Sequence, residues 1–242
     1  MGEPRLEGKI AVVTGGGTGL GRALVLALAE RGADVAFSFH TSARGAEEAA
    51  AAVRASGRRV WTSRADARRP GEISGFVERA AAEMGGVDLL VNNVGIFRKA
   101  ALAELTEDVL DEAFAVNVKA AVMASRAAAP HMRRRGGGSI VNVASLGGLR
   151  PWPSYVAYCS TKAALIMATQ CLALALAPDI RVNAVAPGIL EPPGAGESVR
   201  RKIPLGRFGT PAEVAESVLY LAAGSGYTTG EVIRVDGGRT LR

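Results

Sequence analysis

One stretch of the sequence decides the fold: residues 10–21, IAVVTGGGTGLG. Its first five residues are apolar or β-branched and predict a buried strand at 10–14, and a helix is predicted at 19–31. Glycines between them permit a tight turn and let the backbone at the helix N-terminus approach a pyrophosphate. A turn that merely needs glycine is the alternative, but the setting between strand and helix favours a dinucleotide site. The contacts predicted from this turn are made by Gly15, Thr18, Gly19, Leu20 and Gly21.

The rest of the chain repeats this alternation of strand and helix. Further strands are predicted at 34–39, 59–63, 87–92, 139–144, 180–186 and 232–235. Further helices are predicted at 44–56, 71–84, about 106–134, 154–177 and 211–222. Such alternation implies right-handed crossovers and a mainly parallel sheet covered on both faces. We therefore expect one α/β domain over residues 1–242 with a doubly wound Rossmann fold, whose ligands lie beyond the carboxyl ends of the strands.

Composition argues against several classes of protein. The chain has 242 residues, 48% of them hydrophobic, which is enough for one sizeable core. No run of about 18 apolar residues lacks a charge or a breaker, so no membrane association is expected. The first nine residues include acidic ones and no apolar stretch, unlike a signal peptide. Cys159 and Cys171 are expected to be reduced thiols in a cytoplasmic protein, and their spacing from His40 and His131 predicts no metal site.

The net charge of +6 raises the question of an anionic partner. The densest basic cluster is Arg133–Arg135, which comes just before three glycines. Cations followed by glycine are typical of a helix C-terminus, and a docking patch for an acidic partner is the alternative. No nucleic-acid-binding motif is present, so no nucleic-acid partner is expected.

The end of the second predicted strand bears on the choice of dinucleotide. NAD-binding proteins usually place a carboxylate there to hold the ribose 2′-hydroxyl. Here residues 39–42 contain none, and His40, Thr41 and Ser42, with nearby Arg44, can bind a 2′-phosphate. The sequence therefore predicts NADP(H) rather than NAD(H). Packing of His40 beside the adenine is the alternative.

Two other strand ends carry polar residues suited to the same cofactor. Asp66 can accept a hydrogen bond from the adenine amino group, or it can cap the helix that begins near Pro70. Asn93 can stabilise the adjacent turn, and Gly95 leaves room for a ribose.

Residues of three further segments suit proton transfer. Tyr158 and Lys162 are spaced i and i+4 in a predicted helix, so the ammonium is expected to lower the pKa of the phenol. Ser145 follows a predicted strand and can hydrogen-bond a substrate oxygen, and Asn117 can hold a water that links Lys162 to solvent. A Tyr-x-x-x-Lys pair alone is most simply a helix surface pair, so its value depends on the other two residues.

Together these motifs resemble the short-chain dehydrogenase/reductase family over essentially the whole chain. They are Thr14-Gly15-x-x-x-Gly19-x-Gly21, Asp66, Asn92-Asn93-x-Gly95, Asn117, Ser145, Tyr158-x-x-x-Lys162, Pro187-Gly188 and Val235-Asp236-Gly237-Gly238. The resemblance implies that Tyr158 is the general acid in reduction and the base in oxidation. It implies that Lys162 adjusts the pKa of Tyr158 and binds the nicotinamide ribose. It implies that Ser145 stabilises the substrate oxygen and that Asn117 supports a proton relay. It also implies that Pro187, Gly188 and Ile189 flank the nicotinamide, and that the chain forms a homodimer or homotetramer through its two long helices.

Substrate choice is expected to depend on a loop at about 188–210, which Pro192 and Pro193 should stiffen. The body of the chain resembles 3-oxoacyl-carrier-protein reductases, whose substrate is carried on an acidic protein. Other details, including residues 40–42, are similar to bacterial pteridine-reductase-like members, in which an aromatic residue at the place of Phe97 stacks on the pterin. Phe97 can equally be a packing residue. Ser145 stands where pteridine reductases have aspartate, which favours a carbonyl–alcohol reaction.

The sequence thus predicts an NADP(H)-dependent enzyme that transfers a hydride between nicotinamide and a carbonyl or alcohol. A protein that senses NADP(H) and binds a partner without turnover is the alternative from another class. Such a sensor has no need of Tyr158 and Lys162, which argues against it.

Overall fold

Seven parallel strands form one sheet in the order β3-β2-β1-β4-β5-β6-β7 in the computed structural model, which describes residues 6–190 and 197–241. The strands are β1 (Ile10–Thr14), β2 (Asp34–Phe39), β3 (Val60–Arg64), β4 (Leu89–Asn92), β5 (Gly138–Val143), β6 (Ile180–Pro187) and β7 (Val232–Val235). The chain builds the sheet outward from β1 to β3, then returns to the other side of β1 with β4. The predicted doubly wound α/β fold in a single domain is therefore confirmed.

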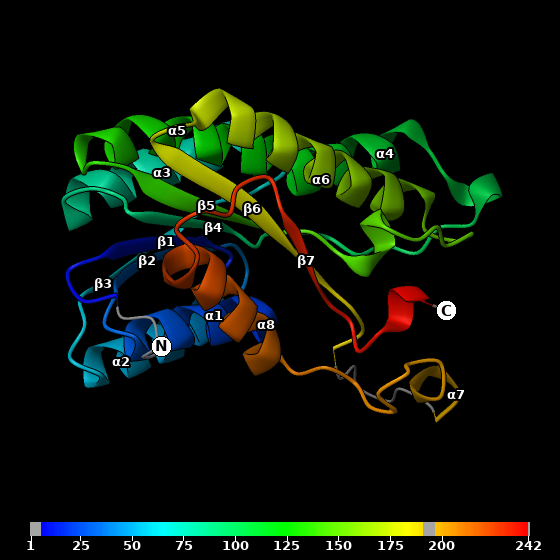
Figure 1. Ribbon diagram of the computed structural model, residues 1–242. Coiled ribbons are helices and arrows are strands. Elements are labelled where there is room, and N and C mark those ends of the chain that lie inside the picture. Colours follow the sequence, from blue (N-terminus) through cyan, green and yellow to red (C-terminus); the bar gives the residue numbers. More distant parts are fainter. Residues whose placement is uncertain (1–5, 191–196, 242) are drawn as a thin grey trace.

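Helices cover both faces of this sheet (Figure 1). On one face lie α1 (Gly19–Glu30), α2 (Ala43–Ala55) and α8 (Pro211–Leu219). On the other lie α3 (Pro70–Met84), α4 (Glu107–Phe114), α5 (Ala120–Arg134) and α6 (Val156–Leu176). The short helix α7 (Glu197–Arg200) lies apart from both layers, near the C-terminal end of the chain (Figure 1).

The sheet is buried on both faces because its central strands are apolar throughout. In β1, Ala11 and Val13 belong to the core cluster that contains Leu24 and Leu28 of α1. The alternate residues Ile10 and Val12 belong to the cluster on the opposite face, with α3 and α5. Successive side chains of a strand point to opposite faces, so a continuous apolar run is what a doubly covered strand requires.

The predicted strands and helices begin and end within two residues of the observed positions, except for two helices that contain π-turns. The long helix predicted at about 106–134 contains a π-turn, η2 (Ala115–Lys119), between α4 and α5. The helix predicted at 211–222 ends as α8 at Leu219 and continues as a second π-turn, η4 (Tyr220–Gly224). Three short 3₁₀ segments were not predicted: η1 (Leu102–Glu104), η3 (Leu146–Gly148) and η5 (Arg239–Leu241). Hydrophobic periodicity does not reveal such single turns.

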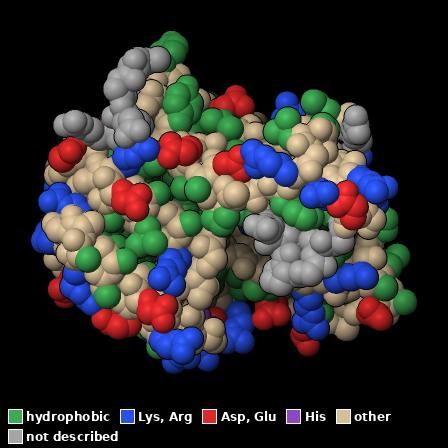
Figure 2. All heavy atoms as spheres, turned by 90° about the horizontal axis from the view of Figure 1, so that it is seen from below, with side chains coloured by type: hydrophobic (Ala, Val, Ile, Leu, Met, Phe, Trp, Pro, Cys, Tyr) green, Lys and Arg blue, Asp and Glu red, His purple; other side chains and the backbone are tan. Residues whose placement is uncertain are grey.

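The arginine cluster ends α5, as predicted. Gly136 follows it with φ +85°, a conformation that favours glycine. Arg133 pairs with Asp179 at 3.1 Å, and Arg135 pairs with Asp88 at 2.9 Å. On the face seen from below, basic and acidic side chains are interspersed around a central hollow (Figure 2). The net positive charge is therefore not gathered in one patch there.

Helix α6 is long and apolar enough to cross a membrane by length and composition alone, with a hydropathy of 1.4 over its most apolar window. Only 28% of that window is buried. One side of the helix contributes Leu165 and Ala173 to the core, and it also buries the ammonium-bearing Lys162. Leu174 and Met167, on the other side, are 85% and 59% exposed. Packing within the domain therefore leaves one apolar side of α6 uncovered.

Both cysteines are free thiols, as expected. Within residues 6–190 and 197–241, no three side chains of the His, Cys, Asp and Glu types gather closely enough to hold a metal ion.

Candidate active site

Two neighbouring cavities lie at the carboxyl ends of the strands, near the reversal of strand order between β1 and β4. We name them the His40 cavity, of about 370 Å³, and the Tyr158 cavity, of about 500 Å³. The predicted residues that line the Tyr158 cavity are Leu20, Asn93, Gly95, Ser145, Tyr158, Lys162, Pro187, Gly188 and Ile189. Those that line the His40 cavity are Gly15, His40, Thr41, Asp66 and Gly95. Neither cavity is lined by Thr18, Gly19, Gly21, Ser42 or Asn117.

The glycine turn between β1 and α1 is tightly packed at Gly15, Gly16 and Gly21. A Cβ at Gly21 would lie 1.9 Å from the carbonyl oxygen of Gly15, and Gly15 itself has φ +73°. Thr18, the N-cap of α1, makes no side-chain cap, and the first turn of the helix holds no acidic residue. Backbone N–H groups and the positive end of the helix dipole are therefore available to an anion, which fits a pyrophosphate.

Asn93 holds this turn in place, as the sequence predicted. Its Nδ2 donates to the carbonyl oxygens of Thr14 at 3.1 Å and Gly15 at 2.9 Å. The Thr14 hydroxyl accepts from the backbone N–H of Asn93 at 3.0 Å. The ends of β1 and β4 are thus locked to each other, and Gly95, two residues further on, lies between the two cavities.

Tyr158 and Ser145 are hydrogen-bonded through their hydroxyl groups. They meet because the turn η3, which follows Ser145, packs directly on α6: a Cβ at Gly147 would lie 2.9 Å from the ring of Tyr158. Burial raises the pKa of the Tyr158 phenol above its ordinary value, and the Ser145 hydrogen bond opposes the rise. The prediction that Lys162 lowers this pKa was wrong, because the ammonium is not in contact with the phenol oxygen.

Lys162 is only 4% exposed, and its Nζ donates to the carbonyl oxygen of Val143 at 2.8 Å. The same Nζ lies 5.9 Å from the centre of the Tyr158 ring. Burial lowers the pKa of Lys162 to about 8, since a charged ammonium is poorly solvated there. A Cβ at Gly95 would come within 3.3 Å of Nζ, so the absence of a side chain at position 95 keeps the ammonium open to the cavity floor.

Asn117 lies in the π-turn η2 and is almost fully buried. Its side-chain Oδ1 accepts from the backbone N–H of Ile96 at 2.8 Å, and its Nδ2 donates to the Ile96 carbonyl at 3.1 Å. Nδ2 also donates to the Thr161 hydroxyl at 2.9 Å. The amide thus ties the segment after β4 to α6.

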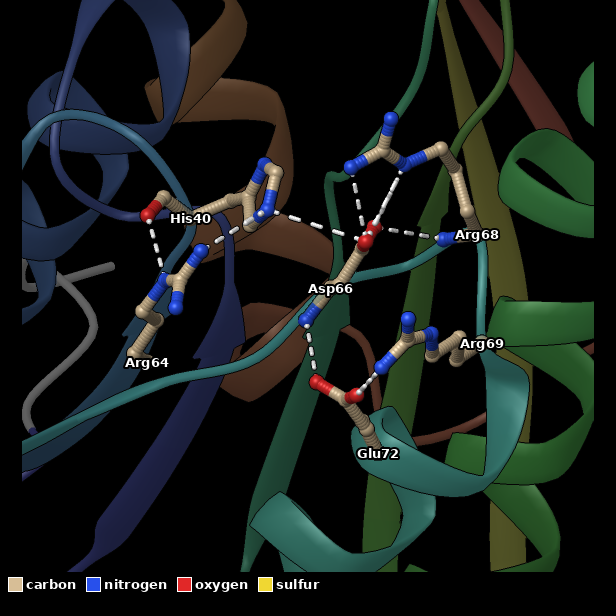
Figure 3. Close-up of polar contacts among 6 residues, drawn as sticks. All are labelled: His40, Arg64, Asp66, Arg68, Arg69 and Glu72. Atoms are coloured by element: carbon tan, nitrogen blue, oxygen red, sulfur yellow. Dashed lines mark hydrogen bonds and ion pairs between the residues drawn. The ribbon is translucent and has the colours of Figure 1, made fainter.

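Asp66 does not cap the next helix, which was one of its two predicted roles. Its carboxylate is clamped by Arg68, whose Nε lies 3.0 Å from both oxygens and whose backbone N–H donates at 3.0 Å (Figure 3). These hydrogen bonds hold the pKa of the Asp66 carboxyl at about 2. The prediction that it might cap the next helix was wrong: Arg69 is the N-cap of α3, and Glu72 turns back to accept from the backbone N–H of Asp66 at 3.0 Å.

The imidazole of His40 faces this clamp across the cavity (Figure 3). Its Nε2 lies 3.7 Å from Asp66 Oδ2 and 3.5 Å from Arg64 Nη2. Arg64 also donates from Nε to the His40 carbonyl oxygen at 3.2 Å. Arg64 and Arg68 were not predicted, because nothing in a sequence distinguishes two arginines near a strand end from ordinary surface charges. Arg68 is paired with Asp66 at 2.8 Å, whereas the guanidinium of Arg64 lies beside the His40 ring.

Thr41 and Ser42 follow His40 into α2. Thr41 lines the His40 cavity, and Ser42 is the N-cap of α2 without a side-chain cap of its own. A Cβ at Gly45 would lie 2.6 Å from the Ser42 hydroxyl and 2.4 Å from the Gly17 carbonyl oxygen. The start of α2 therefore lies against the glycine turn. Arg44 projects into solvent and pairs with Glu48 at 3.6 Å.

Pro187, Gly188 and Ile189 form the far wall of the Tyr158 cavity. The C-terminal Asp-Gly-Gly motif supports them, since a Cβ at Gly188 would lie 2.7 Å from Asp236 Cα. The Asp236 carboxylate accepts from the backbone N–H of Thr240 at 2.7 Å and of Gly238 at 2.9 Å. The predicted substrate loop at about 188–210 continues from here, but Pro192 and Pro193 lie outside the described residues.

Five further residues of the Tyr158 cavity were not predicted: Ile96, Val143, Ala144, Trp152 and Leu190. Phe97 lines the same cavity, 61% exposed. A sequence gives no signal for such apolar neighbours, because only the fold brings them together.

Comparisons with known proteins agree with this geometry. The family model described as enoyl-(acyl carrier protein) reductase matches residues 15–240. The chain is similar to 3-oxoacyl-[acyl-carrier-protein] reductase of Thermotoga maritima, with 37% identity over 98% of this chain and 100% of the relative. It is similar to 7alpha-hydroxysteroid dehydrogenase of Clostridium sardiniense, with 38% identity over 98% of this chain and 95% of the relative. The structure of a short-chain dehydrogenase/reductase from Serratia marcescens superposes with a TM-score of 0.93 at 38% identity, covering 97% of this chain and 99% of that one. The chain therefore belongs to the short-chain dehydrogenase/reductase family, whose members are oxidoreductases that use nicotinamide cofactors.

Proposed function

We propose that this protein is an NADP(H)-dependent oxidoreductase that transfers a hydride between the nicotinamide and a carbonyl or alcohol substrate. The observation that carries the proposal is the hydrogen-bonded pair of Ser145 and Tyr158, with the buried ammonium of Lys162 beside it. A cavity that holds two hydroxyl groups and one ammonium suits a carbonyl oxygen that gains negative charge as it is reduced.

In this proposal NADPH supplies the hydride when bound. The protein holds the substrate and the cofactor in place and supplies a proton. Ser145 and Tyr158 both donate hydrogen bonds to the substrate oxygen, and Tyr158 then gives up its proton to it. The raised pKa of the phenol keeps that proton in place at neutral pH, as an acid in the reduction direction requires. Lys162 anchors the nicotinamide ribose near Gly95. Asn117 supports the proton relay as a positioning residue, by fixing Ile96 and Thr161.

The two cavities give the cofactor a continuous path across the shared wall at Gly95 and Ile96. We propose that the adenine end lies in the His40 cavity, with Asp66 near the adenine amino group, and that the nicotinamide lies in the Tyr158 cavity. The residues proposed to contact the cofactor are Gly15, Thr18, Gly19, Leu20, Gly21, His40, Thr41, Ser42, Asp66, Asn93, Gly95, Tyr158, Lys162, Pro187, Gly188 and Ile189.

The substrate is proposed to be a 3-oxoacyl thioester or a related ketone, and the similarity to the Thermotoga maritima reductase supports that class. Purified protein should oxidise NADPH in the presence of at least one member of a panel of acetoacetyl thioesters, dihydropterins, quinones and simple ketones. Tight NADPH binding without turnover of any of them would favour the NADP(H)-sensing alternative.

NADPH is expected to bind more tightly than NADH. A carboxylate at the end of β2 would repel the 2′-phosphate of NADPH, but His40 stands there, with the guanidinium of Arg64 beside it. His40→Asp should reverse this preference: the new carboxylate accepts from the 2′-hydroxyl of NADH and repels the phosphate of NADPH. Titration of the protein with each nucleotide, followed by energy transfer from tryptophan to the reduced nicotinamide, gives the two dissociation constants.

The matched control is Ala51→Asp, which adds the same charge on the exposed side of α2, away from both cavities. It should leave the ratio of the two dissociation constants unchanged. If the wild-type protein binds NADH more tightly than NADPH, the proposed cofactor preference is wrong.

We also propose that the chain assembles as a homodimer or homotetramer in which the exposed apolar face of α6 is covered. Leu174→Glu places a charge on that face, where burial against a partner would leave it unpaired. The variant is expected to shift the mass measured by light scattering toward the monomer. Leu102→Glu, at a position that is 74% exposed in η1, should leave the mass unchanged. A monomeric wild-type protein would contradict the proposal.

A further inference from the structure

Four aromatic rings meet on one side of the Tyr158 cavity, although only 5% of the residues in the chain are aromatic. Phe97 follows β4, Trp152 and Tyr155 lie between η3 and α6, and Tyr158 belongs to α6. Trp152 lies parallel to Tyr158, with ring centres 6.2 Å apart and planes 10° apart. Phe97 lies almost perpendicular to both, at 6.3 Å from Trp152 and 4.7 Å from Tyr158. We call these four residues the aromatic cluster.

Phe97 is the open member of the aromatic cluster. Tyr155 stacks on it with ring centres 4.7 Å apart and planes 13° apart, so one face of the Phe97 ring is covered. The residue is nevertheless 61% exposed and lines the Tyr158 cavity. Contacts with the other three rings therefore cover only part of Phe97. It presents a flat apolar surface next to the hydroxyl proposed to donate the proton.

The rest of the cavity wall is also apolar on this side. Its side chains include Ile96, Val143, Trp152, Ile189 and Leu190. Among the described residues that line the cavity there is no carboxylate and no guanidinium. The one ammonium, on Lys162, already donates to the Val143 carbonyl oxygen.

The remaining polar side chains of this cavity have assigned partners. The amide of Asn93 is bound to the glycine turn, and Ser145 and Tyr158 are bound to each other. A charged substrate would place its charge in an apolar site without a partner. The several hydrogen-bond donors and acceptors around the edge of a pterin would likewise stay unpaired there. The wall therefore suits a neutral compound with a single polar atom at the reacting centre.

We propose that this cavity takes a neutral ketone with an aryl group attached to the carbonyl carbon, or the corresponding secondary alcohol. The aryl ring lies on Phe97 beside Trp152, and the carbonyl oxygen lies between Ser145 and Tyr158. This inference rests on the proposed function and narrows the substrate from the 3-oxoacyl thioesters and related ketones named there to aryl ketones. In reduction, a hydride from NADPH bonds to the carbonyl carbon while the phenolic proton of Tyr158 goes to the oxygen. The products are the alcohol and NADP⁺, and Tyr158 regains a proton from solvent.

The test compares acetophenone with cyclohexyl methyl ketone. The two ketones have the same number of carbon atoms, but only the ring of acetophenone is flat. The ratio of their kcat/KM values is measured for the wild-type protein and for Phe97→Leu, so that the intrinsic reactivity of each ketone cancels. Phe97→Leu is expected to lower the preference for acetophenone by roughly three- to tenfold, the effect of losing one aromatic contact. The loss should fall on KM rather than kcat, since Phe97 touches the ring and not the reacting atoms.

Two controls isolate the aromatic surface. Tyr227→Leu removes an exposed aromatic residue that lines neither cavity, and it should leave the ratio unchanged. 4-Acetylbenzoate carries a carboxylate on the same ring, and its kcat/KM should fall at least roughly tenfold below that of acetophenone because no cation faces it. Equal ratios in wild type and Phe97→Leu would overturn the inference, and so would efficient turnover of 4-acetylbenzoate or of a dihydropterin.

A binding measurement separates this inference from the proposed function. Titration calorimetry with NADPH-saturated protein compares 1-phenylethanol with 1-cyclohexylethanol, and no turnover occurs because cofactor and alcohol are both reduced. Tighter binding of the phenyl compound, lost in Phe97→Leu, supports the aromatic surface. Equal binding of the two alcohols contradicts it. If no carbonyl compound of the panel is reduced, the proposed function fails, while the calorimetric comparison still decides whether the cavity selects an aryl group.

Discussion

Tyr158→Phe is expected to lower the kcat for ketone reduction by roughly 10²- to 10⁴-fold, the range for loss of a general acid. The variant keeps the ring, and with it the contacts to Phe97 and Trp152, but it removes the hydroxyl that bonds to Ser145. Steady-state oxidation of NADPH with the best ketone of the panel measures the effect.

Two observations tell a catalytic loss from a structural one. NADPH should bind to Tyr158→Phe about as tightly as to the wild-type protein, because the ring and Lys162 remain. Tyr227→Phe removes a hydroxyl from a fully exposed tyrosine and should leave turnover unchanged. Turnover within a fewfold of wild type in Tyr158→Phe would show that another group supplies the proton.

The environment of Tyr158 also bears on the direction of reaction. A phenol with a raised pKa is protonated at neutral pH and is ready to act as an acid, which is what reduction of a ketone needs. Oxidation of the alcohol needs the phenolate, which burial disfavours. We therefore expect alcohol oxidation by this protein to speed up as the pH rises, because more of the phenol is then ionised.

Much of the fold could be predicted from the sequence because its strands are continuous apolar runs. A strand such as β1, buried on both faces, has no polar alternation to obscure it, and a glycine turn marks where the helix begins. The residues at strand ends could be predicted for the same reason. Once the order of strand and helix is known, Asn93 and Ser145 must lie at one edge of the sheet.

What could not be predicted depends on the direction of individual side chains. Tyr158 and Lys162 share a helix face, as their spacing requires, yet the ammonium bonds to Val143 on the neighbouring strand. Asp66 lies at the predicted strand end, but Arg68 rather than the next helix takes its carboxylate. Competition among nearby partners decides such contacts, and the sequence does not rank those partners.

Gly21→Ala is expected to abolish measurable NADPH binding at concentrations that saturate the wild-type protein. The added Cβ would lie 1.9 Å from the Gly15 carbonyl oxygen and 2.6 Å from Asn93 Nδ2. The first of these is a backbone atom that cannot rotate away, so the glycine turn must move. Since Asn93 bridges this turn to the end of β4, the movement reaches both cavities. The free energy of unfolding should fall by about 1–3 kcal/mol, the usual cost of overpacking.

Gly71→Ala is the matched control, because it makes the same chemical change where a Cβ would meet nothing within 4 Å. Gly71 lies in the first turn of α3, away from both cavities, and alanine favours helix there. This variant should bind NADPH like the wild type and unfold at an equal or higher urea concentration. Urea titration and nucleotide titration of the two variants side by side test the argument. If Gly21→Ala matches Gly71→Ala in both measurements, the glycine turn tolerates a side chain at its tightest point. The cofactor site would then not depend on close packing of this turn.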